Sequence, residues 1–226
     1  MSPSSVSVWA NATSRPPTRP ARAVLTSLGR DPDFREAGGH AHFHLARLDL
    51  AEGHFVTARD RFAVVAMDNP AASYANDALD LGLAIAEELD NPSGGPTLLS
   101  LYARAVYFDL VSQPAARGEA LRRFIAQAEA LADPDEPQRL LERGCWELAR
   151  LEARSGRPAE ALELYTRITV NHPDGRYPAA ALAERARLLA AGGRPAEARA
   201  VLEQLLAQYP DWLFVDDARE ALRSLP

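Results

Sequence analysis

Residues 147–182 read ELARLEARSGRPAEALELYTRITVNHPDGRYPAAAL, and this stretch decides the fold. Its apolar residues recur at spacings of three and four, which is typical of amphipathic helices. Gly156 stands where a left-handed backbone would end one helix, and Pro158 stands where a helix can begin without its missing N–H. Pro173 then stops the second helix, and Asp174 is expected to cap the next one. The stretch therefore predicts two antiparallel helices joined by a tight turn.

Two other stretches, residues 44–79 and 184–219, align with this one without a gap. The copies match in eight columns: the turn glycine (Gly53, Gly156, Gly193), a small residue seven before it (Ala46, Ala149, Ala186), a leucine five before it (Leu48, Leu151, Leu188), an alanine five after it (Ala58, Ala161, Ala198), a large apolar residue nine after it (Phe62, Tyr165, Leu202), a proline seventeen after it (Pro70, Pro173, Pro210), an aromatic four past that proline (Tyr74, Tyr177, Phe214) and an alanine eight past it (Ala78, Ala181, Ala218). Self-similarity of this kind is the signature of a repeat architecture.

A degenerate fourth copy occupies residues 97–132, where Ala120 and Phe124 keep the spacing of the second helix. The whole pattern predicts an all-α, right-handed α-solenoid of antiparallel helix pairs. About ten helices are expected, at roughly 37–52, 55–68, 73–89, 97–112, 116–131, 137–155, 158–171, 177–191, 195–208 and 212–224, with a short helical turn at 22–28. A flexible Pro- and Ser-rich leader at 1–21 precedes one repeat domain at 22–226, with repeats at 36–75, 97–132, 140–176 and 177–212 and a capping helix at 212–224.

These columns resemble the tetratricopeptide repeat (TPR): a small residue, a glycine turn, alanine-x3-aromatic or leucine, and a closing proline. The resemblance covers residues 36–226. The large aromatic expected early in the first helix is replaced by His42, Cys145 and Leu182, and Gly156 and Gly193 lie 37 residues apart rather than the usual 34 or so. That longer form is most similar to the repeats of bacterial envelope proteins, such as the Tol-Pal-associated periplasmic protein and the lipoprotein of the outer-membrane barrel assembly machinery.

Composition narrows the function classes. The net charge is −6, and all 25 basic residues are arginine, so a general nucleic-acid binder, which needs clustered basic surface, is not expected. No stretch is apolar enough to insert into a membrane, and residues 1–20 lack the apolar core of a secretion signal. The sequence as it stands therefore predicts a cytoplasmic protein, whereas the envelope resemblance predicts the periplasm if the N-terminus is truncated.

Residues that could carry chemistry are scarce. We find no phosphate-binding loop, no nucleophile elbow and no zinc-ligand spacing, so the sequence predicts no enzyme, no cofactor and no metal. His40 and His44 would share a helix face, but two ligands make a weak metal site, and the expected reading is a repeat helix in which His42 replaces a core aromatic. Cys145, the single cysteine, falls at a core position and is expected to be ordinary packing.

A column of arginines is the best candidate for a binding site. In TPR proteins the first helix of each pair lines a concave groove, and the ninth repeat position commonly faces it; here that position is Arg47, Arg150 and Arg187. Arg143, Trp146 and Arg154 are expected at neighbouring groove positions of the second copy. Arginine suits the binding of a peptide carboxylate because two N–H groups of its guanidinium can contact both oxygens. The alternative is that Glu147 and Glu184, each three residues earlier, pair with Arg150 and Arg187 within their own helices.

The sequence therefore predicts a non-catalytic scaffold that binds a peptide or helix of another protein, possibly an acidic one, in a concave groove. The alternative is a structural subunit or fragment of a bacterial cell-envelope assembly, docking through its terminal helices around Trp212, Leu213 and Phe214.

Overall fold

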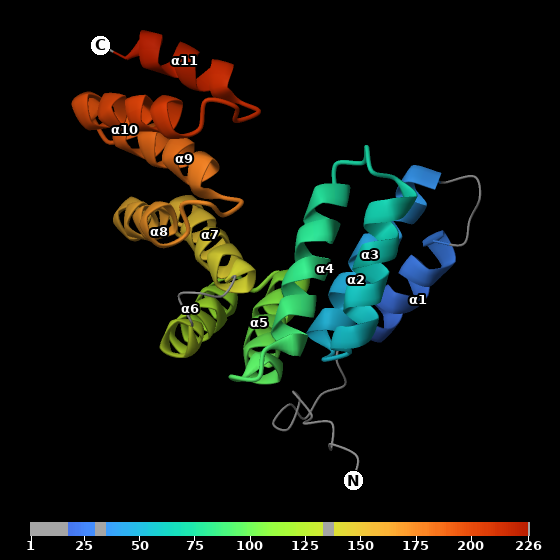
Figure 1. Ribbon diagram of the computed structural model, residues 1–226. Helices are drawn as coiled ribbons and strands as arrows, with labels where there is room; N and C mark the ends of the chain where they lie inside the picture. Colours follow the sequence, from blue (N-terminus) through green and yellow to red (C-terminus); the bar gives the residue numbers. More distant parts are fainter. Residues whose placement is uncertain (1–17, 30–34, 133–137, 226) are drawn as a thin grey trace. The chain divides into compact units, whose positions relative to one another are not determined.

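The protein is helical throughout the part that the structure, a computed structural model, describes: residues 18–29, 35–132 and 138–225 (Figure 1). These residues contain no strand, which confirms the predicted all-α class. Within them, no helix combines the length and the apolar character needed to cross a bilayer. The helices are α1 (Thr18–Gly29), α2 (Arg35–Ala51), α3 (Phe55–Asp68), α4 (Ala75–Asp90), α5 (Gly95–Leu110), α6 (Pro114–Leu131), α7 (Arg139–Arg154), α8 (Pro158–Asn171), α9 (Pro178–Ala191), α10 (Pro195–Gln208) and α11 (Val215–Ser224).

The helices group into two compact units, residues 1–140 and 141–226. The first unit holds α1 to α6, and the second begins near the start of α7 and holds α8 to α11. Within each unit, consecutive helices joined by short turns pack against each other, as the hairpin pattern of the repeats requires.

The turns form as the sequence predicts. Gly53, Gly156 and Gly193 have φ values of 83°, 74° and 72°, in the left-handed region that favours glycine. Pro158 and Pro195 are the first residues of α8 and α10. The predicted cap Asp174 is wrong: α9 begins at Pro178, and Tyr177 occupies the N-cap position without a side-chain hydrogen bond to the helix. The aromatic column therefore marks the start of the next repeat.

The N-terminal boundary also differs from the prediction. Residues 18–21, assigned to the leader, are the first turn of α1, which is a 12-residue helix rather than a short turn. Arg22 secures this helix, because its Nη1 donates to Asp49 Oδ1 of α2 at 2.8 Å, and Arg61 Nε of α3 donates to the other oxygen at 2.8 Å. The rest of the leader and the segment 133–137 lie outside the described residues.

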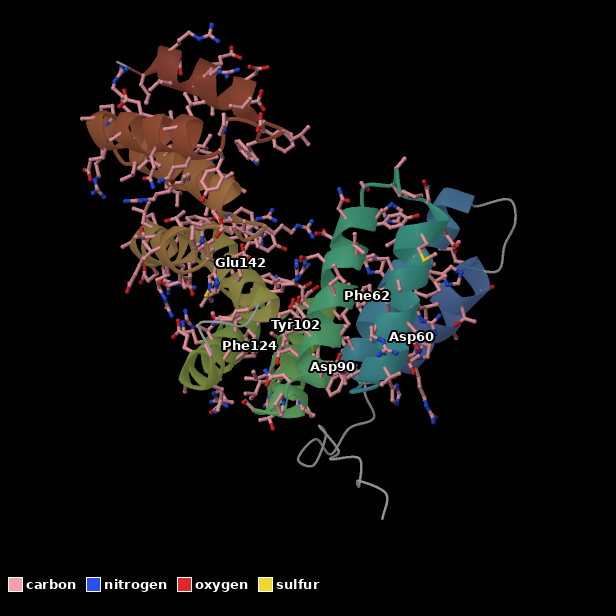
Figure 2. The ribbon with its side chains drawn as sticks, viewed as in Figure 1. Asp60, Phe62, Asp90, Tyr102, Phe124 and Glu142 are labelled. Carbon is pink, nitrogen blue, oxygen red and sulfur yellow. The ribbon has the colours of Figure 1, made fainter. Side chains whose placement is uncertain are left out.

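Aromatic side chains form the core of the first unit, and Figure 2 labels Phe62, Tyr102 and Phe124 between its helices. Phe62 and Phe124 have no solvent-accessible surface. Tyr102 of α5 meets Phe124 of α6 edge to face, with 5.4 Å between ring centroids. Ala120, one turn earlier on α6, is also buried. The degenerate copy predicted at 97–132 is therefore a packed helix pair.

Replacing Ala161 or Ala198 with leucine should lower the free energy of unfolding by about 1–3 kcal/mol, because the added volume has no space between the paired helices. Both alanines are fully buried, as the repeat pattern predicted. Urea titration would measure the loss, with exposed Ala200 of α10 replaced by leucine as the matched control. Equal stability of all three variants would contradict the assigned helix pairing.

Candidate protein-binding groove

The three members of the arginine column have different neighbours. Arg47, on α2 of the first unit, donates from Nη2 to Asp109 Oδ2 at 2.5 Å. Arg187 on α9 holds Glu184 of its own helix with Nε and Nη2, at 2.9 and 2.7 Å, as the alternative reading of the sequence expected. Arg150 on α7 lies over the ring of Trp146, 5.7 Å from its centroid. The structure thus brings Arg150 and Arg187 into the second unit, while Arg47 belongs to the first.

Trp146 anchors the start of α9. Its ring stacks on Tyr177 with 5.2 Å between centroids and an interplanar angle of 15°. Arg143 reinforces the contact, because its Nη1 donates to Tyr177 Oη at 3.0 Å and its Nε donates to Glu147 at 3.1 Å. The sequence placed Arg143 in the open groove; the structure buries it, with 8% exposed, so that it packs the junction between repeats. Arg154 stays exposed, with its Nε donating to the Arg150 carbonyl at 3.2 Å.

Glu142 is a buried residue of this junction that sequence reasoning missed. One carboxylate oxygen accepts the backbone N–H of Tyr177 at 2.7 Å, and the other accepts that of Arg176 at 3.2 Å. A carboxylate at the N-terminus of α9 satisfies donors that the helix cannot use itself and complements the helix dipole. The partners lie more than 30 residues away in sequence, so the helical pattern of α7 gives no sign of them.

An open cavity of about 500 Å³ lies between α9 and α11 of the second unit. We call it the α9–α11 cavity. Most of its lining is apolar, and the largest apolar side chains there are Leu202, Trp212, Phe214 and Leu225. Charge comes from Glu184 and Arg187 on α9 and from Asp217 on α11. Phe214 is 52% exposed although Trp212 packs against its edge, with ring centroids 5.4 Å apart. The cavity thus combines apolar surface with one arginine of the column.

The three histidines at positions 40, 42 and 44 have separate environments. His40 packs edge-on against Tyr74, with 4.5 Å between ring centroids. His42 Nε2 lies 3.2 Å from the Gly29 carbonyl at the end of α1, so this residue joins α2 to α1. His44 is half-buried, and burial together with the nearby Arg47 lowers its pKa, because both disfavour the charged imidazolium.

A second group, Asp49, Glu52 and His54, has donor atoms within 4.8 Å of one another. Its carboxylates already have cationic partners. Arg22 and Arg61 contact Asp49, and Arg22 Nη2 lies 2.7 Å from Glu52. Arginine therefore neutralises this group, which makes it a set of ion pairs that ties α1 and α3 to the end of α2.

Cys145 should react with thiol reagents only when the protein unfolds. The side chain is buried, and burial, with a smaller contribution from Glu142, raises the pKa of the thiol to about 12. Because the thiolate is the nucleophile, an exposed cysteine of pKa about 8.5 would react faster as the pH rises from 7 to 9. Cys145 should instead stay unreactive across that range. A chromogenic disulfide reagent with and without urea measures this, and fast labelling of the native protein at pH 8 would contradict the placement of Cys145.

Comparison with known proteins agrees with the repeat reading. The tetratricopeptide repeat family matches residues 152–225. No curated protein matches the chain. Among solved structures, this chain is similar to the nearly identical TPR-like repeats of a candidate kinesin light chain from Podosopora anserina. The two chains share 19% sequence identity with a TM-score of 0.49, and the match covers 81% of this chain and 82% of that chain. A single-substitution variant of that protein gives the same values. The match to the tetratricopeptide repeat family thus runs from the end of α7 through α11.

Proposed function

We propose that the protein is a non-catalytic scaffold that binds a segment of another protein along the groove faces of α7, α9 and α11. The observation that carries the proposal is the α9–α11 cavity, an apolar hollow of about 500 Å³ with Arg187 at its edge. Its volume falls in the range of roughly 300–1,000 Å³ that is typical of ligand sites. Tetratricopeptide repeats generally mediate protein–protein interaction, and this segment carries the matched repeats.

Arginine would orient the partner, and apolar surface would supply most of the affinity. Arg150 and Arg154 are exposed on α7, and the Arg187 side chain is 61% exposed on α9. The Arg187–Glu184 pair is a surface ion pair, which contributes only about 0–1 kcal/mol, so a partner carboxylate can compete with it. Arg47, in the first unit, would be a separate contact point for the partner.

Affinity capture from cells that produce the protein tests this proposal. The variant Arg150→Glu/Arg187→Glu should retain at least tenfold less of the bound partner, and the parent complex should weaken as salt is raised, because exposed charges are screened over about 8–10 Å. Arg123→Glu is the matched control, since Arg123 forms an exposed intrahelical pair with Glu119 in the first unit. Equal capture by the double variant, the control and the parent would contradict groove binding.

A second candidate function is that of a subunit in a larger assembly, as the resemblance to envelope repeats implies. The observation that favours it is the exposure of Leu213, 84%, next to Phe214 at the start of α11. Exposed apolar side chains side by side are typical of protein contacts. This candidate implies the periplasm as the compartment.

Solution mass separates the two candidates. Groove binding predicts a monomer of 24.6 kDa in sedimentation equilibrium, and the assembly predicts a stable oligomer that Leu213→Asp dissociates. An oligomer that this substitution leaves intact would contradict docking through the terminal residues.

A further inference from the structure

One repeat position holds an aromatic residue in the first two copies and alanine in the last. In the first two copies its ring packs against the aromatic that follows the closing proline. The fifth position of the repeat lies 31 residues before the aromatic at the start of the next helix pair: Phe43 before Tyr74, Trp146 before Tyr177, and Ala183 before Phe214. In the first two copies the two rings pack together, with centroids 6.1 Å apart for Phe43 and Tyr74 and 5.2 Å apart for Trp146 and Tyr177. In the last copy alanine leaves the second ring without its partner ring.

Solvent exposure follows this difference. Tyr74 and Tyr177 are 6% and 7% exposed, whereas Phe214 is 52% exposed. The space that the missing ring would occupy belongs to the α9–α11 cavity, because Ala183 and Phe214 both line it. The other junction residues are also absent, since Ala179 and Ala180 stand where the second copy has Glu142 and Arg143. The last repeat therefore keeps the aromatic at Phe214 but lacks the ring that would pack against it.

Arg187 completes the comparison. In the second copy, Arg150 lies four residues after Trp146, one helical turn on, and its guanidinium lies over the indole ring. Arg187 stands in the same relation to Ala183, and it lines the cavity. A ring that filled the cavity would therefore meet Phe214 on one side and a guanidinium on the other, an arrangement that favours aromatic groups through stacking and cation–π attraction.

We infer that the α9–α11 cavity is a receptor for an aromatic side chain, foremost tryptophan, presented by a peptide segment of a partner protein. This inference rests on the proposed scaffold function and specifies the chemistry of its partner. The lining includes two carboxylates, from Glu184 and Asp217, and one guanidinium, from Arg187. Because negative charge is in excess, the partner's aromatic ring makes the main contact here, and a partner carboxylate does not. Binding at this cavity should accordingly change little with salt, unlike carboxylate binding by the arginines.

The test uses the full chain and two peptides, acetyl-Gly-Ser-Trp-Ser-Gly-amide and the same peptide with alanine in place of tryptophan. Proton–nitrogen NMR should show saturable shifts at Ala183, Arg187 and Ala218 with the tryptophan peptide and none with the alanine peptide. Ala183→Trp supplies the missing ring from the chain itself, so it should weaken binding at least tenfold and raise the Tm by a few degrees. Ala200→Trp, which adds the same ring to an exposed site on α10, should bind like the parent.

Phe214→Ala gives an independent check, since it removes the stacking partner at an exposed position and should also abolish the shifts. The inference is overturned if the alanine peptide binds equally well or if Ala183→Trp binds like the parent. If the parent self-associates and Ala183→Trp abolishes this self-association, the cavity binds a second copy of the chain. That result would overturn the inference that it binds a peptide of a partner protein. Loss of cellular capture in Arg150→Glu/Arg187→Glu without any tryptophan-peptide binding would leave the scaffold function standing and reject the aromatic receptor.

Discussion

The Phe124→Ala variant is expected to lose about 3–5 kcal/mol of its free energy of unfolding, the range observed when a buried phenylalanine is truncated. Phe124 has no accessible surface and packs edge to face on Tyr102. Truncation removes the apolar contacts of the ring and leaves a void between α5 and α6, which the surrounding helices can close only in part. Urea denaturation followed by far-UV circular dichroism should show a lower midpoint for the first unit.

Val64→Ala is the matched control, because Val64 is 55% exposed on α3 of the same unit. Its change should stay within about 0.5 kcal/mol, as is usual for surface substitutions. If Phe124→Ala behaved like Val64→Ala, the degenerate copy would not be the packed helix pair described above.

Trp146→Ala should be the most damaging change in the candidate groove, with a loss of about 2–3 kcal/mol. This is less than for a fully buried aromatic, because Trp146 is half-buried. The variant loses the stack on Tyr177 and the contact with Arg150. The variant should also expose Tyr177, in the same way that alanine at position 183 leaves Phe214 exposed. It should therefore create a second aromatic receptor in the second unit. Denaturation and titration with the tryptophan peptide measure the two effects.

Trp146→Phe separates aromatic pairing from general packing, since a phenyl ring can still pack on Tyr177, as Phe43 does on Tyr74. It should recover more than half of the lost stability, and Val170→Ala, at a position 68% exposed on α8, should be neutral. A phenylalanine variant as unstable as the alanine variant would show that the ring contact is not what holds α9 on α7.

Much of the fold could be predicted from the sequence because the determinants are local. The turn glycines, the prolines at the starts of α8 and α10, and the buried alanine columns each act within one helix pair. The start of α1 could not be predicted, since its stability depends on Arg22 reaching Asp49, 27 residues away. The aspartate cap failed for a related reason: Glu142 of the preceding repeat serves the N-terminus of α9 in place of Asp174.

The candidate site was predictable only in part. Repeat positions predict that Trp146 and Arg150 lie close together on one helix, and in the structure the Arg150 guanidinium lies over the Trp146 ring. The same positions could not show that Arg143 is buried, because its partner Tyr177 comes from the next repeat, 34 residues later. The α9–α11 cavity has no signal among the charged residues; its signal in the sequence is a missing aromatic at Ala183 beside a retained one at Phe214.

Site-specific photo-crosslinking tests the central claim, partner binding at this groove, most directly. A benzophenone amino acid placed at Ala183, and in parallel at exposed Val170 on α8, would be activated in cells that produce the protein. We expect the probe at 183 to crosslink a partner through a peptide that contains an aromatic residue, and the probe at 170 to give little or no product. Equal crosslinking from both positions, or none from 183, would contradict a protein-binding groove between α9 and α11.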